Sequence, residues 1–175
     1  MEEPGLHFRR LARSDFPRVV SWLAQPHVAE WWGTPLGLVE VEAQYGPCVD
    51  GTDPTMVFVG AQGSTDFALV QIYRLADNPA YAQAVGVPDG AGIDLLIGDP
   101  SLCGRGWGTR IIVAALEMGW NAYPDVRWAM AGPSVRNIGS QRAFAKAGFR
   151  AERQVRVPDE EDDEMILVCP RPTAA

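Results

Sequence analysis

The most constraining feature of this sequence is a short apolar run followed by a glycine-rich loop and an amphipathic segment. Gly92–Gly98 reads Gly-Ile-Asp-Leu-Leu-Ile-Gly, and Cys103–Thr109 reads Cys-Gly-Arg-Gly-Trp-Gly-Thr before the amphipathic residues 110–122. We therefore predict a strand, a loop and a helix in that order. Glycine lets a backbone approach a ligand closely, and the first helical turn has free N–H groups at the positive end of its dipole. The combination predicts a site for a phosphate or pyrophosphate.

Neither of the two common nucleotide-binding motifs fits the spacing of these glycines. They stand at positions 104, 106 and 108, whereas the dinucleotide fingerprint is G-x-G-x-x-G with an acidic residue about twenty positions later. The Lys-Ser/Thr pair of nucleoside-triphosphate loops is also absent from the loop sequence. Taken alone, the loop is equally compatible with a tight turn that binds nothing, so the residues after it decide.

The segments after the loop add a second pattern. We predict a strand over 126–130, a polar loop over 133–137, and a helix over 138–147 that Gly148 closes before a strand begins at Phe149. Together with the glycine loop, this order resembles the GCN5-related N-acetyltransferase (GNAT) family. The resemblance is carried by Gly104-Arg-Gly-Trp-Gly-Thr109, by Asn137 and by Ala143-Phe-Ala-Lys-Ala-Gly-Phe149.

Three further motifs make the resemblance closer. Ala29-Glu-Trp-Trp-Gly33, Gly92-Ile-Asp-Leu-Leu96 and Val157-Pro-Asp159 look like those of the aminoglycoside 6′-N-acetyltransferases. The resemblance implies an α/β fold with a central, mostly antiparallel twisted sheet flanked by helices. It also implies one acetyltransferase domain over residues 1–175, with a short unstructured tail from about residue 170.

The same resemblance implies acetyl-coenzyme A as co-substrate and no metal. In this family the strand before the loop pairs through its backbone with the pantetheine arm, and the loop N–H groups receive the pyrophosphate, whose charge Arg105 or Arg110 can screen. A basic or neutral residue commonly leads the loop, and Cys103 stands there instead. The residues expected to bind the co-substrate are Leu96, Ile97, Cys103, Gly104, Arg105, Gly106, Trp107, Gly108, Thr109 and Asn137.

Asp94 is the candidate catalytic residue. It interrupts an otherwise apolar strand, so its carboxylate faces water at a cleft or has a buried partner, since a buried unpaired charge is costly. Acetyl transfer to an amine requires the ammonium to lose a proton, and a carboxylate can accept it. The resemblance places the active-site aspartate of the family here. The alternative is a structural aspartate that caps a neighbouring turn.

Four residues are candidates for the acceptor site. Trp31 and Trp32 are adjacent, and because neighbours on a helix point about 100° apart, they cannot both face one core. We expect Trp32 to line a surface cleft, with helix-end packing as the alternative. Residues 74–91 have no consistent period, and the resemblance assigns acceptor contacts in this stretch to Asp77 and Tyr81 and, further on, to Asp159.

The chain departs from the resembled enzymes at two positions. A tyrosine that protonates the departing thiolate is common in the family, and Phe144 occupies its place. The closer relatives tend to carry an aspartate before Pro133 that helps to hold the aminoglycoside, and this chain has Gly132. The acidic run Asp159–Glu164 is a candidate replacement, or else a solvated turn.

The composition limits the classes of molecule that the chain is expected to bind. The 175 residues carry a formal net charge of −7, and Lys146 is the single lysine, so nucleic acid is a poor partner and a polycationic amine a better one. Three scattered cysteines and two histidines form no disulfide framework or zinc motif. No signal peptide or membrane span is evident. We expect a cytoplasmic protein with no membrane partner, either a monomer or a homodimer.

The remaining elements follow from periodicity and turn residues. We expect a strand over 6–11, helices over 14–25, 27–32 and 36–45, and a hairpin of strands 55–60 and 67–73. Gly46 and Pro47 are expected to end the third helix, and the prolines and glycines of 74–91 to prevent a helix there.

The function that this reading favours is acetylation of the 6′-amino group of aminoglycoside antibiotics, which confers resistance. Two alternatives remain open. One is acetylation of another amine or hydroxylamine, such as a siderophore-type acceptor. The other is a sensor module that binds an acyl-coenzyme A without catalysis, which the absence of a tyrosine at position 144 favours.

Overall fold

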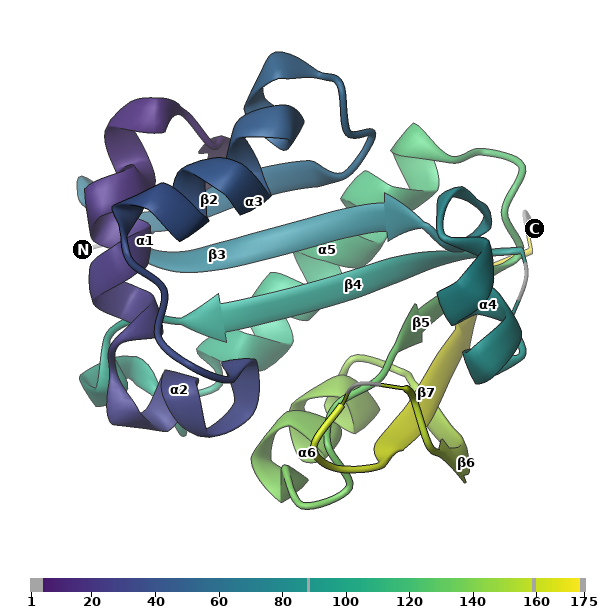
Figure 1. Ribbon diagram of the computed structural model, residues 1–175. Coiled ribbons are helices and arrows are strands. Elements are labelled where there is room, and N and C mark those ends of the chain that lie inside the picture. The colour runs from purple at the N-terminus through teal and green to yellow at the C-terminus, as the bar shows by residue number, and fades with distance from the viewer. Residues whose placement is uncertain (1–4, 88, 159, 174–175) are drawn as a thin grey trace. The chain divides into compact units, whose positions relative to one another are not determined.

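The structure of the chain is a computed structural model that describes residues 5–87, 89–158 and 160–173. It contains a seven-stranded sheet in the order β1-β2-β3-β4-β5-β7-β6, with helices between the strands (Figure 1). Of the strand pairs with a described register, β1 with β2, β5 with β7 and β6 with β7 are antiparallel, and β4 with β5 is parallel. The expected mixed α/β fold with a mostly antiparallel sheet is confirmed.

The chain divides into two compact units. The first consists of the chain up to Gln71 together with Leu95–Trp107, and the second of Ile72–Asp94 together with the chain from Gly108 onward. Strands β3 (Thr65–Arg74) and β4 (Gly90–Ile97) each run from one unit into the other. We describe each unit by itself.

The first unit packs three helices on strands from the N-terminal half of the chain. Its elements are β1 (Leu6–Arg10), α1 (Phe16–Leu23), α2 (Pro26–Trp32), α3 (Leu38–Asp50), β2 (Met56–Gln62), the first part of β3, and the end of β4. The apolar faces of α1 and α3 bury Phe16, Val19, Val41 and Tyr45 with Val59 of β2 (Figure 1). Short 3₁₀ turns at Arg13–Asp15 and Pro100–Leu102 complete this unit.

Helix α3 is longer than its sequence suggested. We expected Gly46 and Pro47 to end it, but it continues to Asp50 with Pro47 inside. A proline removes one helical hydrogen bond and costs about 3 kcal/mol in a helix interior. Val41 and Tyr45 anchor the helix in the core, so tertiary packing outweighs the local preference. Gly51, with a φ of 76°, ends the helix instead.

The second unit contains the remaining elements. These are α4 (Pro79–Val85), the start of β4, α5 (Trp107–Ala122, from Gly108), β5 (Trp128–Ala131), α6 (Ile138–Lys146), β6 (Arg150–Val155) and β7 (Glu164–Pro170). Ala82 and Val85 of α4 pack in one core cluster with Met130 of β5 and Ile166 of β7. This packing brings α4 to the strands that carry the candidate site.

Helix α4 corrects our expectation that residues 74–91 contain no helix. Pro79 stands in the first helical turn, where its fixed φ is favourable and its missing N–H costs nothing. Gly86 caps the other end with a φ of 70°. The two residues that we interpreted as helix breakers are therefore the start and stop signals of a short helix. Their spacing leaves only two turns, too few to show an amphipathic period.

The ladder between β4 and β5 is short. Within the described residues it joins Gly90, Ala91 and Gly92 of β4 to Trp128, Ala129 and Met130 of β5, and β4 then continues to Ile97. Asp94 therefore lies on β4 beyond the last residue that pairs with β5. A backbone edge that a neighbouring strand does not use is available to pair with an extended ligand.

Candidate active site

Asp94 is a half-buried carboxylate on β4. Burial raises the pKa of its carboxyl to about 6, the hydrogen bond from Tyr73 lowers it, and the nearby charge of Glu160 raises it further. A carboxylate with these properties is able both to accept and to release a proton near neutral pH.

Tyr73 reaches Asp94 because position 92 has no side chain. Tyr73 lies on β3, and its ring occupies the space next to Gly92 on β4, where an added Cβ would overlap the ring. Gly92 and Asp94 are two residues apart, so they share one face of the strand. Burial, followed by the charge of Asp94, raises the pKa of Tyr73 well above its usual value.

Tyr81 and Glu164 extend the polar cluster. The hydroxyl of Tyr81, on α4, donates to Oε2 of Glu164 at the start of β7, at 2.8 Å. Tyr81 also acts electrostatically on Tyr73. Burial raises the pKa of Glu164 to about 7, the hydrogen bond from Tyr81 lowers it, and the charges of Asp94 and Glu160 raise it. Asp94, Tyr73, Tyr81 and Glu164 thus form one electrostatically coupled group, in which Tyr81 and Glu164 are hydrogen-bonded.

Gly132 provides the space for the carboxylate of Glu164. An added Cβ at Gly132 would overlap Oε2 of Glu164 and lie 2.8 Å from the hydroxyl of Tyr81. This is the position at which the sequence resemblance leads us to expect an aspartate, and this chain has a glycine. In this chain the carboxylate of Glu164 occupies the adjacent space.

Two further residues of the acidic run, Asp162 and Asp163, form ion pairs. Asp162 forms an ion pair with Arg136 at 2.8 Å and accepts from Ser134 Oγ at 3.0 Å. Asp163 accepts from Gln154 Nε2 at 2.6 Å and pairs with Arg156 at 3.4 Å. The loop is therefore tied to the segments around it and is more than a solvated turn.

The other residues predicted for the acceptor site lie in different surroundings. Tyr81 joins the cluster of Asp94. Asp77 is exposed in the 3₁₀ turn Leu75–Asp77, and its charge acts on Arg74. Trp32 is half-buried at the end of α2 and packs against the core of the first unit. Asp159 lies outside the described residues.

The glycine loop has the backbone that its sequence predicted. Gly104 and Gly106 have φ values of 72° and 84°, in the left-handed region that favours glycine. An added Cβ at either glycine would meet no atom within 4 Å, so the backbone on these sides is open. Arg105 between them is exposed, as is Cys103, which follows the 3₁₀ turn Pro100–Leu102.

The residues that end the loop anchor helix α5. Trp107 is buried and makes an edge contact with Phe67, with ring centroids 5.2 Å apart. In the second unit, Gly108 lets α5 approach α6, because its Cβ position is 3.5 Å from Cβ of Ala143. The hydroxyl of Thr109 donates to the carbonyl of Ala143 at 3.4 Å. Trp107, Gly108 and Thr109 thus hold the N-terminus of α5 in place.

Asn137 and the end of β4 carry the remaining co-substrate predictions. Oδ1 of Asn137 accepts from the backbone N–H of Ser140 at 3.0 Å and caps α6. Leu96 is buried, and the carbonyl of Ile97 is 2.8 Å from Nε2 of His27. His27 therefore engages one of the backbone groups that we expected to face the pantetheine arm.

Phe144 is a core residue. It is 3% exposed and makes an edge contact with Phe149, with ring centroids 4.9 Å apart. Its place on α6 is set by apolar packing.

Sequence reasoning missed Tyr73 and did not separate Glu164 from its acidic run. The available signal was indirect: Gly92 stands two residues before an aspartate in a strand, which indicates that another group approaches that strand closely. The sequence did not show which residues meet in this cluster, because they are distant along the chain. Tyr81 and Glu164, for example, are 83 positions apart.

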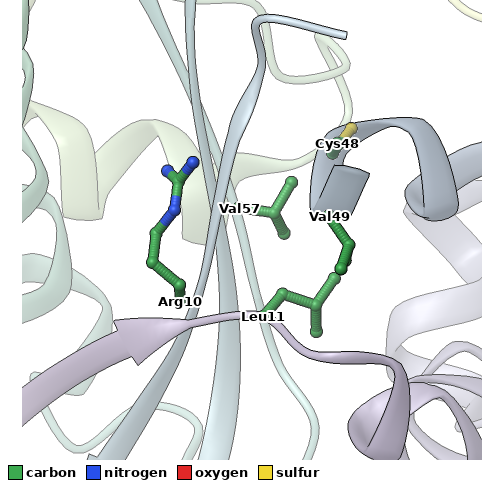
Figure 2. Close-up of a pocket in the computed structure, with 5 residues that line it drawn as sticks. All are labelled: Arg10, Leu11, Cys48, Val49 and Val57. Atoms are coloured by element: carbon green, nitrogen blue, oxygen red, sulfur yellow. The ribbon is translucent and has the colours of Figure 1, made fainter. Parts of the chain in front are cut away.

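A small cavity lies in the first unit. Its volume is about 60 Å³, and it is lined by Arg10, Leu11, Cys48, Val49 and Val57 (Figure 2). Burial raises the pKa of the Cys48 thiol, which disfavours the reactive thiolate. This cavity contains none of the predicted site residues.

In the described part of the chain, no three His, Cys, Asp or Glu side chains are grouped to hold a metal ion. None of the described helices is long and apolar enough to cross a membrane.

Comparisons with known proteins agree with this fold. Residues 12–157 match the Acetyltransferase (GNAT) domain family. The chain is 28% identical over 155 residues to an aminoglycoside N(6′)-acetyltransferase type 1 of Klebsiella pneumoniae, covering 86% of this chain and 77% of that protein. It is 35% identical over 72 residues to a kanamycin resistance protein of Rhizobium radiobacter, covering 41% of this chain and 66% of that protein.

Solved structures give the same relationship. The crystal structure of aminoglycoside acetyltransferase AAC(6′)-Ib in complex with coenzyme A has a TM-score of 0.81 and 26% identity, with 95% of each chain covered. The same scores and coverage hold for its complex with coenzyme A and kanamycin. Because the family match spans residues 12–157, this chain belongs to the GNAT family of acetyltransferases.

Proposed function

We propose that this chain transfers the acetyl group of acetyl-coenzyme A to the 6′-amino group of aminoglycosides, and thereby confers resistance to them. The observation that carries the proposal is the half-buried Asp94, placed on β4 directly before the segment Leu95–Ile97. The similarity to aminoglycoside N(6′)-acetyltransferases over 86% of the chain supports the choice of acceptor.

Asp94 acts as the general base. The 6′-amine arrives as an ammonium ion, which has no lone pair for attack, so one N–H bond must break first. Asp94 accepts this proton, and its pKa of about 6 leaves it ionised at neutral pH yet basic enough to take the proton. Acetyl-coenzyme A, when bound, supplies the thioester that the neutral amine attacks.

The glycine loop fits the co-substrate. The open backbone at Gly104 and Gly106 leaves room beside the loop, and α5 presents the N–H groups of its first turn. Arg105 and Arg110, both exposed, add positive charge for the diphosphate. Leu96 and the N–H of Ile97 offer backbone groups to the pantetheine arm, while His27 holds the carbonyl of Ile97. Asn137 orders the start of α6.

The acceptor site is built from carboxylates and aromatic rings. Asp94 and Glu164 attract the ammonium groups of a polycation, and Tyr81 fixes the position of Glu164. Trp32 is a candidate platform for a sugar ring, and Asp77 and Asp159 complete the set that we propose to contact the drug. The net charge of −7 increases the encounter rate with a cation.

The departing thiolate receives no proton from position 144. Phe144 has no ionisable group and is buried, so the thiolate leaves unaided or takes a proton from the amine side of the site. We propose that residues 1–175 act as a single domain and that the enzyme works in the cytoplasm, where the ribosomes that the drug inhibits are found.

The test is release of free thiol from acetyl-coenzyme A by the purified protein, followed with a disulfide reagent. The acceptors are kanamycin, an aminoglycoside without a 6′-amine, lysine and a hydroxylamine. We expect rapid turnover only with the 6′-amine drug. Turnover with the hydroxylamine alone, or coenzyme A binding without any turnover, would favour the siderophore-type enzyme or the sensor, respectively.

A further inference from the structure

The end of strand β4 is held by three contacts within the first unit. The N–H of Gly98, directly after the strand, donates to the carbonyl of Phe67 on β3 at 2.7 Å. Trp22 of α1 lies against the same residue, since a Cβ added at Gly98 would be 2.0 Å from its indole ring. From α2, Nε2 of His27 is 2.8 Å from the carbonyl oxygen of Ile97. The strand end therefore has little freedom to move.

His27 approaches the edge of β4 that β3 does not use. In an extended strand the N–H and C=O of one residue point to the same edge, and those of the next residue point to the opposite edge. Because the N–H of Gly98 points to β3, the backbone groups of Ile97 point away from β3. Among the described residues, β5 pairs with β4 only up to Gly92. The ring of His27 therefore lies at the edge that we assign to the pantetheine arm.

The imidazole of His27 is the donor in this contact, and its backbone is firmly placed. A carbonyl oxygen only accepts hydrogen bonds, so Nε2 of His27 carries the hydrogen. His27 lies in the first turn of α2, and the next residue, Val28, is 3% exposed in the core of the unit. A water molecule would satisfy the same carbonyl without tying the strand to a helix. The contact therefore fixes the end of β4 to α2.

The strand end leads directly into the glycine loop, which begins in the same unit. Oδ1 of Asp99 accepts from the N–H of Ser101 at 2.8 Å, and the N–H of Cys103 donates to the carbonyl of Pro100 at 3.2 Å. These bonds build the 3₁₀ turn between the strand and the loop. The edge at Ile97 and the loop are thus joined by a compact turn, so the position of one constrains the position of the other.

We propose that His27 is a positioning residue for the co-substrate, which holds Ile97 so that the pantetheine arm pairs with β4 in a single register. The inference rests on the proposed function, which places the arm along this edge. By occupying the carbonyl of Ile97, His27 leaves only the N–H of that residue for an amide group of the arm. His27 thereby ends the pairing at Ile97, directly before the turn to the glycine loop. A binding edge that is already fixed costs less to order when the ligand binds.

The test compares coenzyme A with adenosine 3′,5′-bisphosphate, the part of that molecule that lacks the arm. Isothermal titration calorimetry measures the Kd of each ligand. His27→Leu removes the donor and keeps a side chain of similar size. We expect the Kd for coenzyme A to rise about threefold to tenfold, as for the loss of one neutral hydrogen bond. The Kd for adenosine 3′,5′-bisphosphate should stay within about twofold of the wild-type value.

Two further variants separate the hydrogen bond from the bulk of the side chain. His27→Gln keeps a side-chain N–H donor and should bind coenzyme A within about twofold of the wild type. His7→Leu makes the same change as His27→Leu at an exposed residue of β1 in the same unit, and should leave the Kd of both ligands unchanged. If His27→Gln binds coenzyme A as weakly as His27→Leu, donation by His27 is not the cause and the proposal is overturned.

The comparison of the two ligands separates a positioning role from a general structural one. Equal weakening of both ligands in His27→Leu would show that the substitution disturbs the whole site, and unchanged binding of coenzyme A would show that the contact does not serve the arm. Either result overturns the proposal. Neither titration needs an acceptor, so if no aminoglycoside is acetylated but the loss of affinity is confined to coenzyme A, the proposed acceptor is wrong and the role of His27 stands. A wild type that does not bind coenzyme A would overturn both.

Discussion

The carboxylate of Glu164 lies in the space that a side chain at Gly132 would occupy, and there it accepts a hydrogen bond from the hydroxyl of Tyr81. Gly132 and Glu164 are distant in sequence, and the side chain of Glu164 fills the space that Gly132 leaves open. Glycine at 132 removes a side chain from the site, and the glutamate that begins β7 supplies a carboxylate from the neighbouring segment.

Gly132→Ala should displace Glu164 with little cost in folding. The overlapping atoms are the carboxyl end of the flexible Glu164 side chain and the hydroxyl of Tyr81, so both side chains must shift. We expect the free energy of unfolding to fall by about 1 kcal/mol. Turnover should fall as in Glu164→Gln, and combining the two changes should add nothing further. Gly139→Ala, with only one atom within 4 Å of its Cβ position, is the control and should keep full activity. If the losses of turnover in Gly132→Ala and Glu164→Gln were additive in the double variant, Gly132 would not act by leaving space for Glu164.

Gly92→Ala should damage the protein more severely. The added methyl would overlap the ring of Tyr73, which is rigid and packed between β3 and β4, so the ring must leave its place. We expect a loss of about 1–3 kcal/mol in unfolding free energy, as for other overpacked sites, together with a higher pKa of Asp94, because its hydrogen-bond donor moves away. Urea unfolding measures the first effect. A variant as stable as the wild type would show that Tyr73 adjusts without cost.

Asp94→Asn should abolish most of the turnover. Loss of a general base typically costs about 10²–10⁴-fold, and coenzyme A binding should persist because the glycine loop is unchanged. In the wild type, kcat/KM for the drug should rise with pH through about 6, since the base must be ionised. Asp89→Asn, an exposed residue before β4, is the control. Full activity of Asp94→Asn would remove Asp94 from the mechanism.

The same substitution should stabilise the fold at neutral pH. The folded pKa of Asp94 is raised to about 6, so its ionisation opposes folding once the pH exceeds the unfolded value of about 3.9. The loss of unfolding free energy that ionised Asp94 causes grows as the pH rises from the unfolded pKa towards the folded pKa of this residue. Urea unfolding should find Asp94→Asn more stable than the wild type at pH 7.5, and the difference should vanish near pH 4. A variant less stable at pH 7.5 would indicate a structural aspartate.

Asp15 should show the opposite pH dependence. It is 4% exposed and accepts two hydrogen bonds from Arg9, both at 2.7 Å, which hold its pKa below the usual value. The contribution of ionised Asp15 to the free energy of unfolding is therefore present above the unfolded pKa of about 3.9. It is lost as the pH falls through the lower pKa of the folded state. Asp15→Asn should cost about 1–3 kcal/mol at pH 7, measured by urea unfolding. A cost that persists unchanged at pH 2 would exclude the ion pair as its source.

The sequence by itself determined the strand, glycine loop and helix around residues 92–122, the family, and the aspartate on the strand. These depend on residues within a few positions of each other: glycines that adopt a positive φ, a periodic apolar face, and a cap. The local signals failed where their meaning depended on context. Pro79 and Gly86 bound a two-turn helix, and Pro47 lies inside a helix that core packing maintains.

Only the tertiary structure decided which side chains share the site with Asp94. Tyr73, Tyr81 and Glu164 come from three different elements, and Tyr81 lies 83 positions from Glu164. No local preference encodes such a meeting, because it depends on strand pairing and on the packing of α4 against β5 and β7. Burial then sets the proton affinities of Asp94 and Glu164, since desolvation depends on neighbours in space rather than in sequence.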